Sequence, residues 1–184
     1  VTTDSTIPAY VAISRNVKCE EETLTFGCGA HFDVRIAISR ALTEMNQTLY
    51  LMESGRMTAR AMSEREQFMK TWNRRARLEK QPHLAPALEI PSKTNVSYSD
   101  FYHEDLLEDL DRCCEITRNL GLELLVNNLT RPDVGMSVVK VIVPGLRHFR
   151  ARFAPGRLYD VPVQQGWASQ PLTESELNPI AWWI

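Results

Sequence analysis

The segment 27–33 reads Gly-Cys-Gly-Ala-His-Phe-Asp and separates a short apolar run from a long helical pattern. Its two glycines permit positive φ values or the close approach of another stretch of backbone. Asp33 is a residue type that commonly caps a helix N-terminus. The segment therefore predicts a tight turn from a strand that ends near Phe26 into a helix that begins at Asp33.

The same turn has a second interpretation as an anion site. Backbone N–H groups at a helix N-terminus favour anions, and glycine lets a phosphate come close. The third glycine of the dinucleotide fingerprint is missing, and so is the Gly-Lys-Ser/Thr of a Walker A loop. A strand-to-helix turn and a phosphate-binding turn therefore both remain open, with His31 beside it as a candidate general base.

Apolar periodicity predicts the remaining elements. We expect strands at 8–14 and 23–26, helices at 33–53, 63–79 and 105–120, and buried strands at 122–127 and 137–143. Residues 81–99 contain three prolines and are expected to form a long loop. The chain after Pro144 is expected to be irregular and to end in a tail over 163–184. Helices and strands alternate, which predicts a single α/β or α+β domain with a mixed sheet packed by helices.

Composition excludes several classes of protein. The chain has 184 residues, with 21 Lys and Arg against 23 Asp and Glu, so it lacks the positive excess of a dedicated nucleic-acid binder. No apolar run approaches the roughly 18–20 residues that span a bilayer, and no signal peptide is visible. We therefore expect a cytoplasmic protein. Because the first residue is Val1, we expect either processing or a start inside a longer protein.

The four cysteines do not predict a metal site. Cys19, Cys28, Cys113 and Cys114 form no C-x-x-C pair, and ligands for tetrahedral zinc usually come from such short knuckles. We interpret them as reduced thiols, two of them on one helix.

One face of the predicted helix 33–53 carries polar side chains that suit a nucleotide. Arg40, Glu44 and Gln47 lie at positions i, i+4 and i+7, hence on one face. A carboxylate can bind Mg²⁺, and a side-chain amide can bind a phosphate or ribose oxygen. The alternative is a solvent-exposed face with an Arg–Glu pair worth a few tenths of a kcal/mol. Spacing alone favours this alternative.

Two basic segments could likewise bind a ligand or simply lie on the solvated surface. The run 74–77 is offset by nearby glutamates and is interpreted as a solvated helix face. The segment 144–162 carries four arginines and one histidine, His148, among aromatics and glycines. Its arginines either clamp phosphates or carboxylates, or tie a peripheral loop through Arg–Asp pairs. The sequence leaves these two possibilities equal.

Taken together and in order, several motifs resemble one family. They lie at 7–8, 11–14, 27–33, 40–47, 130–135, 138–146, 152–162 and 177–179. They resemble the YcaO-domain proteins, and more narrowly the ATP-dependent cyclodehydratases that build thiazoline and oxazoline rings in ribosomal peptides. The region 54–100 is the least family-like part of the chain.

This resemblance implies a reaction and its partners. Family members use ATP and Mg²⁺ to phosphorylate a backbone amide oxygen of a peptide, and a following Cys, Ser or Thr side chain then closes the azoline ring. Phosphorylation makes a poor leaving group a good one. The implied substrate is a ribosomal precursor peptide, as in bacteriocin biosynthesis. The implied partner is a protein that binds the leader peptide.

The resemblance also implies roles for single residues. Glu44 resembles the helical carboxylate that binds the Mg²⁺ of the nucleotide, and Gln47 a neighbouring nucleotide ligand. Arg40 on the same face, and Arg56 near Glu53, are further candidate nucleotide contacts. A phosphate contact is expected from one of four arginines, which are Arg131, Arg147, Arg152 and Arg157. Candidate catalytic groups are His31 and the terminal carboxylate of Ile184.

The chain departs from the family pattern at both ends. It lacks the S-x-x-E-x-x-E-R-type motif of the N-terminal part, and residues 178–184 keep only Pro179 of a proline-rich tail. We therefore expect the C-terminal part of a YcaO domain. It is either an azoline-forming or thioamide-forming enzyme with its missing half, or a non-catalytic module that binds a peptide or partner. Because exposed sheet edges promote association, we also expect a homo-oligomer.

Overall fold

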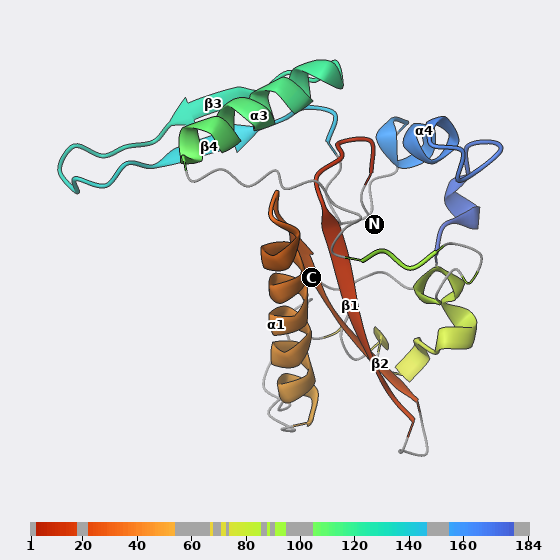
Figure 1. Ribbon diagram of the computed structural model, residues 1–184. Coiled ribbons are helices and arrows are strands. Elements are labelled where there is room, and N and C mark those ends of the chain that lie inside the picture. Colours follow the sequence, from red (N-terminus) through yellow and green to blue (C-terminus); the bar gives the residue numbers. More distant parts are fainter. Residues whose placement is uncertain are drawn as a thin grey trace.

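The computed structural model describes residues 3–17, 22–53, 67, 71–72, 74–85, 88, 91–94, 105–146 and 155–178. The strands are β1 (Ala9–Asn16), β2 (Thr23–Ala30), β3 (Leu125–Asn128) and β4 (Val139–Ile142). The α-helices are α1 (Val34–Glu53), α3 (Leu106–Asn119) and α4 (Arg157–Gln164), and short 3-10 helices are η1 (Leu78–Lys80), η2 (Pro82–Leu84) and η4 (Glu174–Glu176). A body forms around the β1–β2 hairpin, and an arm of α3, β3 and β4 projects from it (Figure 1).

The body is organised by an antiparallel hairpin with a helix on one face. β1 and β2 pair from Ala9 with Ala30 to Asn16 with Thr23. Side chains alternate between the two faces of a strand. Leu24 and Phe26 of β2 are buried in the core cluster on one face, whereas Gly27 and Gly29 lie against α1 on the other.

The two glycines of β2 make room for the backbone of α1. A Cβ atom at Gly27 would lie 2.2 Å from Met45 N and 2.3 Å from Ala41 O, and one at Gly29 would lie 2.0 Å from Ala37 O. Neither glycine has a positive φ. The prediction that the strand ends at Phe26 and turns at these glycines is therefore wrong. Both glycines belong to β2, and they lack a side chain because the backbone of α1 occupies the space that a Cβ would need.

The opposite face of β2 carries the main core cluster. Trp72 is fully buried there with Leu24, Phe26, Ala76 and Leu84. The Trp72 Nε1–H donates to the Leu24 carbonyl oxygen at 2.8 Å, and its ring meets the Phe26 ring edge-to-face at 5.3 Å between centroids. This confirms the apolar side predicted for residues 72 and 76.

The segment after Trp72 is more structured than the sequence predicts. Of the helix predicted at 63–79, helical backbone is described at 67, 71–72 and 74–75, and residues 76–77 are not helical. η1 and η2 follow at once, so the loop expected at 81–99 begins with a helical turn at 82–84. Phe68 and Met69, expected on the same apolar side, lie outside the described residues.

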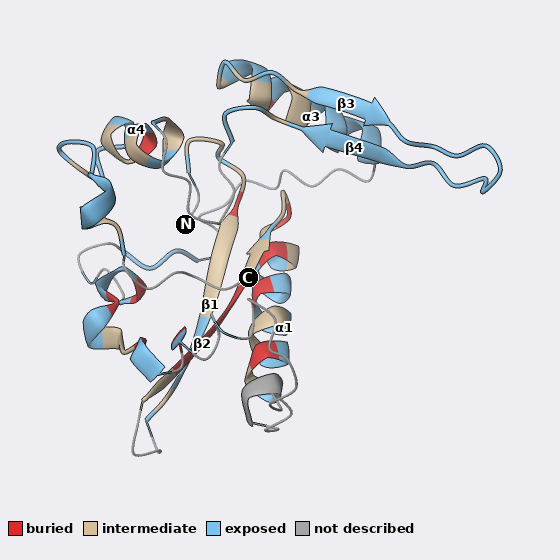
Figure 2. Ribbon diagram, turned by 180° about the vertical axis from the view of Figure 1, so that it is seen from behind, coloured by how far each residue is buried: buried red, intermediate tan, exposed pale blue. Residues whose placement is uncertain are grey.

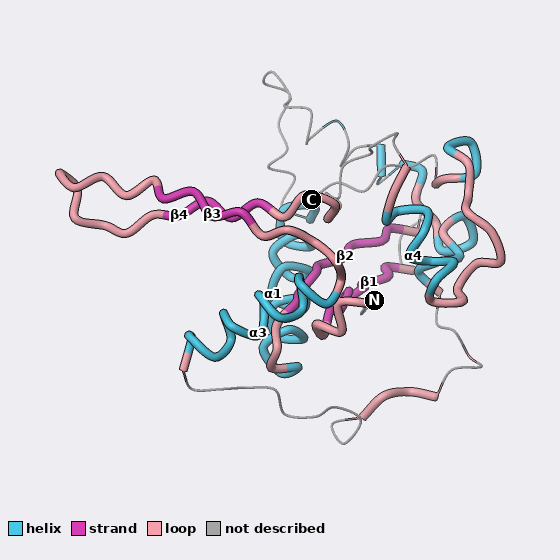
Figure 3. Tube along the Cα trace, turned by 90° about the horizontal axis from the view of Figure 1, so that it is seen from above, coloured by secondary structure: helices cyan, strands magenta, loops and turns pink. Residues whose placement is uncertain are grey.

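The arm begins with a helix whose ends match the prediction. The Asp105 side chain accepts a hydrogen bond from Leu107 N at 2.8 Å and caps α3, and Gly121 follows it with a φ of 68°. β3 and β4 pair antiparallel, Leu125 with Ile142 to Asn128 with Val139. Both strands are shorter than predicted, and every residue in them is exposed rather than buried (Figure 2). No other element of the described chain covers them, and the hairpin extends away from the body (Figure 3).

The chain after Pro144 contains a helix that the sequence did not predict. α4 starts after Gly156, whose φ of 126° favours glycine, and extends two residues into the expected tail over 163–184. The expectation of irregular structure is therefore wrong for 157–164. The predicted class of helices with sheets is confirmed, with each described sheet two-stranded and antiparallel. No helix of the described residues is long and apolar enough to cross a membrane.

Candidate functional site

The polar face of α1 lies at the outer edge of β2. In the described chain β2 has one hydrogen-bonded neighbour, β1, so backbone groups on its other edge need different partners. Glu44 supplies one, because its Oε2 accepts a hydrogen bond from Cys28 N at 2.7 Å. Arg40 supplies another, because its Nη1 donates to the Ala30 carbonyl oxygen at 3.3 Å. Two of the three predicted residues therefore meet at this edge.

The half-buried Glu44 carboxylate retains capacity for a metal. Its Oε1 has no hydrogen-bond partner among the described residues, and the bond to Cys28 N fixes the orientation of the group. The described chain contains no cluster of three His, Cys, Asp or Glu residues placed to hold a metal ion. A lone carboxylate fits Mg²⁺ that takes its other ligands from nucleotide phosphates and water, since Mg²⁺ is commonly held by one or two carboxylates plus substrate phosphates.

Gln47 and Arg40 are exposed on the same side of α1 as Glu44. The side chain of Gln47 lies about one turn beyond Glu44, within reach of a ligand that Glu44 helps to bind. This face of α1, made of Arg40, Glu44 and Gln47, is the candidate nucleotide face. It combines a cation, a carboxylate and an amide on one rigid element.

The N-terminus of α1 is already occupied by a carboxylate. Asp33 Oδ1 accepts a hydrogen bond from Arg35 N at 2.8 Å, and the Arg35 guanidinium pairs with Asp33 Oδ2 at 2.7 Å. The side-chain hydrogen bond from Arg35 lowers the pKa of Asp33 to about 2. A phosphate at this end of the helix would face the Asp33 charge. The space beside Gly27 and Gly29 is filled by helix backbone, so these glycines form neither a turn nor a phosphate cradle, and the chain passes from strand to helix at residues 31–33.

His31 is oriented by the same turn. Its Nδ1 accepts a hydrogen bond from Asp33 N at 2.9 Å. In the neutral ring the proton therefore sits on Nε2, which makes that atom a donor rather than a base. The general-base role of His31 stays a prediction, and it requires the hydrogen bond to Asp33 N to break.

Two of the candidate phosphate-binding arginines already have carboxylate partners. Arg157 Nη2 donates to both oxygens of Asp4, at 2.5 and 2.7 Å, and both side chains are mostly buried. Arg131 pairs with Asp133 on the exposed turn of the arm at 2.5 Å. α4 and α1 lie on opposite sides of the hairpin (Figure 1), so Arg157 does not join the candidate nucleotide face.

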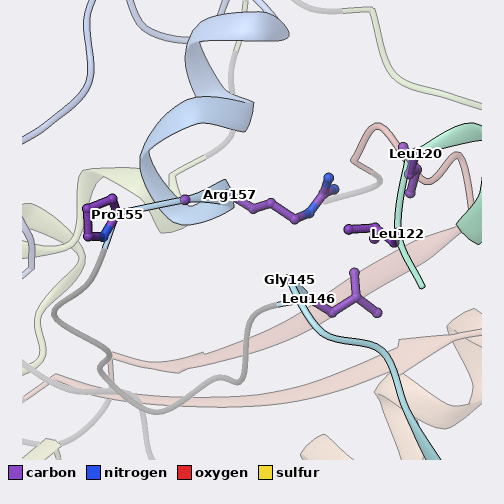
Figure 4. A pocket seen from close by; sticks show the side chains of 7 residues that line it. Leu120, Leu122, Gly145, Leu146, Pro155 and Arg157 are labelled. Atoms are coloured by element: carbon purple, nitrogen blue, oxygen red, sulfur yellow. The ribbon is translucent and has the colours of Figure 1, made fainter. Parts of the chain in front are cut away.

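Arg157 instead lines a cavity between α4 and the arm. The cavity has a volume of about 420 Å³ and is bounded mainly by apolar residues, which are Leu120, Leu122, Gly145, Leu146, Pro155 and Gly156. Figure 4 shows the Arg157 side chain extending from α4 toward Leu120 and Leu122. The Asp–Arg pair tethers the N-terminal segment to α4, as the loop interpretation of these arginines expects.

Several predicted site residues lie outside the described residues. They are Arg56, Arg147, His148, Arg152 and Ile184. Their roles remain predictions. Glu53 is the last residue of α1.

Sequence reasoning missed the backbone partners of the candidate nucleotide face. Nothing in the pattern connects Cys28 with Glu44, because the hydrogen bond uses a main-chain N–H. Burial, followed by the nearby Glu44 charge, raises the pKa of the Cys28 thiol. Cys28, Cys113 and Cys114 are free, and Cys113 and Cys114 both lie on α3 as predicted, whereas Cys19 lies outside the described residues.

The chain matches known proteins over most of its length. The family model described as YcaO cyclodehydratase, ATP- and Mg²⁺-binding, matches residues 1–147. A protein of Methanothermobacter thermautotrophicus described as uncharacterized is 33% identical over 153 residues, which are 81% of this chain and 38% of that protein.

Two solved structures are similar to the whole fold. A heterocyclase in complex with substrate and cofactor is 41% identical, with a TM-score of 0.86 over 100% of this chain and 24% of that one. The heterocyclase TruD is also 41% identical, with a TM-score of 0.83 over 97% of this chain and 23% of that one. The chain thus spans about a quarter of the solved heterocyclases that it matches. With the family model covering most of its residues, the chain belongs to the YcaO cyclodehydratase family.

Proposed function

We propose that this chain supplies the helix that holds Mg·ATP in a YcaO enzyme which cyclises peptides. The observation that carries the proposal is the Glu44 carboxylate, fixed by Cys28 N with its second oxygen open to a cation. The family description, ATP- and Mg²⁺-binding, agrees with this use. The single carboxylate of Glu44 is enough for Mg²⁺ that takes further ligands from the nucleotide phosphates.

The proposed reaction converts a peptide amide into an azoline ring. The γ-phosphoryl group of ATP is transferred to the amide oxygen of the substrate, and ADP leaves. The Cys, Ser or Thr side chain that follows attacks the same carbon and gives up its proton. Phosphate then leaves with the former amide oxygen, and the amide nitrogen gives up its proton as the C=N bond of the ring forms. Bound Mg²⁺ offsets charge on the transferring phosphate. Glu44 would hold that ion, while Arg40 and Gln47 would contact phosphate or ribose oxygens.

The substrate in this proposal is a ribosomal precursor peptide, presented with help from a protein that binds its leader. One solved neighbour is described as a heterocyclase in complex with substrate and cofactor, which supports a cofactor-dependent ring-forming reaction; the peptide substrate is what the family resemblance implies. Because the chain spans about a quarter of that structure, further parts of the ATP site are expected from polypeptide that this chain does not include.

A second function is favoured by one observation. The described residues contain no group of three metal-binding side chains, so they do not by themselves form a complete metal site. A chain that has lost catalysis would still bind peptide or partner protein as a module. The two functions differ in whether ATP is consumed.

Mass spectrometry separates the two functions. We would incubate the chain, joined to the polypeptide that completes the ATP site, with Mg·ATP and a synthetic peptide that contains Cys, Ser and Thr, and measure peptide mass and ADP. Loss of one water per ring, with ADP formed in equal amount and no loss in Glu44→Gln, is the result expected for the enzyme. Peptide binding without water loss or ADP would instead support the binding module.

A further inference from the structure

The C-terminal segment, residues 155–178, is fastened to the body at two points that are far apart along the chain. Near its start, Arg157 pairs with Asp4. At its end, Asn178 Nδ2 donates to Gln81 Oε1 at 2.5 Å. The paired residues are 153 and 97 positions apart in sequence, so both contacts join remote parts of the fold.

Gln81 is a buried polar side chain in an apolar setting. It is 1% exposed and lies between η1 and η2, next to the cluster that contains Trp72 and Leu84. Its own backbone is satisfied locally, because Gln81 N donates to Leu78 O and its carbonyl accepts from Leu84 N. The side-chain amide is therefore not needed to form the turn. A buried amide requires a hydrogen-bond partner, and Asn178 provides it.

The residues just before Asn178 are held in place by hydrogen bonds of their own. Thr173 and Glu176 form a reciprocal capping box around η4, with the Glu176 carboxylate accepting from Thr173 N and Thr173 Oγ1, both at 2.7 Å. These hydrogen bonds lower the pKa of Glu176. The capping box fixes the backbone just before Leu177 and Asn178. The hydrogen bond from Asn178 to Gln81 therefore also sets the position of η4.

We propose that Gln81 is a positioning residue that docks the C-terminal segment on the Trp72 face of the hairpin. The contact sets where residues 171–178 lie and from which point the chain continues beyond Asn178. The device is separate from the candidate nucleotide face, which uses α1 on the other face of the hairpin. It operates without nucleotide and does not depend on the proposed function.

The test exchanges the two amide side chains. Gln81→Asn shortens one partner by a methylene, and Asn178→Gln lengthens the other. The double variant restores the summed length. Hydrogen exchange measured by mass spectrometry on the chain is expected to accelerate at 171–178 by about threefold to tenfold in either single variant. Exchange in the double variant is expected to return toward wild type, while α1 exchanges at the same rate in all four proteins.

Two results would overturn the proposal. One is unchanged exchange at 171–178 in both single variants. The other is hydrogen exchange at 171–178 that is as fast in the double variant as in the single variants, because two independent losses of stability would show no rescue. If Gln81→Asn fails to fold, Asn178→Ala is measured instead, because Asn178 is exposed and its loss leaves the core intact. Exchange at 171–178 that equals the wild-type rate in this variant would also overturn the proposal. Mg·ATP titration of the same variants reports separately on the α1 face.

Discussion

The Glu44 side chain of α1 and the Cys28 backbone of β2 are joined by a 2.7 Å hydrogen bond across the helix–hairpin interface. The bond links a candidate magnesium ligand to the strand edge on which its helix packs. It is possible only because Gly27 and Gly29 let the helix backbone approach the strand. Glu44 therefore has a structural role, the hydrogen bond to Cys28 N, and a proposed role in binding Mg²⁺. Substitutions can separate the two roles.

The first prediction concerns the structural role of Glu44. Glu44→Ala removes the acceptor of Cys28 N and is expected to lower the free energy of unfolding by about 1 to 3 kcal/mol. Glu44→Gln retains a carbonyl acceptor and is expected to cost less than half as much. Urea unfolding followed by circular dichroism measures both. Equal losses in the two variants would contradict a role for the hydrogen bond.

The second prediction concerns the glycines of β2. Gly27→Ala places a Cβ 2.2 Å from Met45 N, so α1 must move outward. We expect a loss of at least about 3 kcal/mol in the free energy of unfolding, the upper range for overpacking. Gly166→Ala is the matched control, because it meets no atom within 4 Å and strains only a φ of 72°. It is expected to cost about 1 to 2 kcal/mol in thermal unfolding.

The third prediction concerns Trp72. Trp72→Phe keeps an aromatic ring beside Phe26 but removes the donor to the Leu24 carbonyl oxygen. An unsatisfied buried carbonyl and a small cavity are together expected to cost about 2 to 4 kcal/mol. Chemical denaturation monitored by far-ultraviolet circular dichroism checks this. A loss below 1 kcal/mol would place Trp72 outside the core.

The fourth prediction concerns pH. The pKa of Asp33 is about 2 in the folded chain, against about 3.9 for an unfolded Asp. The folded pKa is the lower one, so this group contributes stability that is complete above about pH 5 and is lost as pH falls through about 2. Asp33→Asn is expected to flatten the change of melting temperature with pH in that window. An unchanged slope would show that Arg35 does not hold the carboxylate.

The fifth prediction concerns the arm. Val126 and Val141 are a cross-strand pair, 59% and 52% exposed, and Leu125, Val139 and Ile142 of the same two strands are also exposed. Such a surface favours association, which is the basis of the homo-oligomer expected from the sequence. Sedimentation velocity is expected to show self-association that increases with concentration and weakens in the Val126→Thr, Val141→Thr double variant. A clean monomer at every concentration would contradict it.

Local sequence signals predicted the elements whose causes are local. Asp33 and Asp105 mark the starts of α1 and α3 because their side chains cap those helices. The apolar spacing of Trp72 and Ala76 identified the face that packs on β2. The family resemblance, confirmed by the family model and solved structures, followed from motifs read together.

Features that depend on contacts between distant segments were not predicted. Gly27 resembles a turn residue in sequence, and only the packed helix shows that it must lack a side chain. α4 follows Gly156 directly and includes Pro162, and a proline usually opposes a helix interior. The exposure of β3 and β4 depends on what covers them, which their apolar sequence does not encode.

The most direct test of the account is calorimetric titration of the chain with Mg·ATP, repeated with Glu44→Gln. The glutamine variant keeps an acceptor for Cys28 N and removes the charge that would bind Mg²⁺. We predict saturable binding to the wild-type chain and at least about a tenfold weaker affinity in the variant. Equal affinity in the two proteins would contradict the claim that α1 holds the nucleotide, and so would no binding to a folded wild-type chain in the presence of the polypeptide that completes the site.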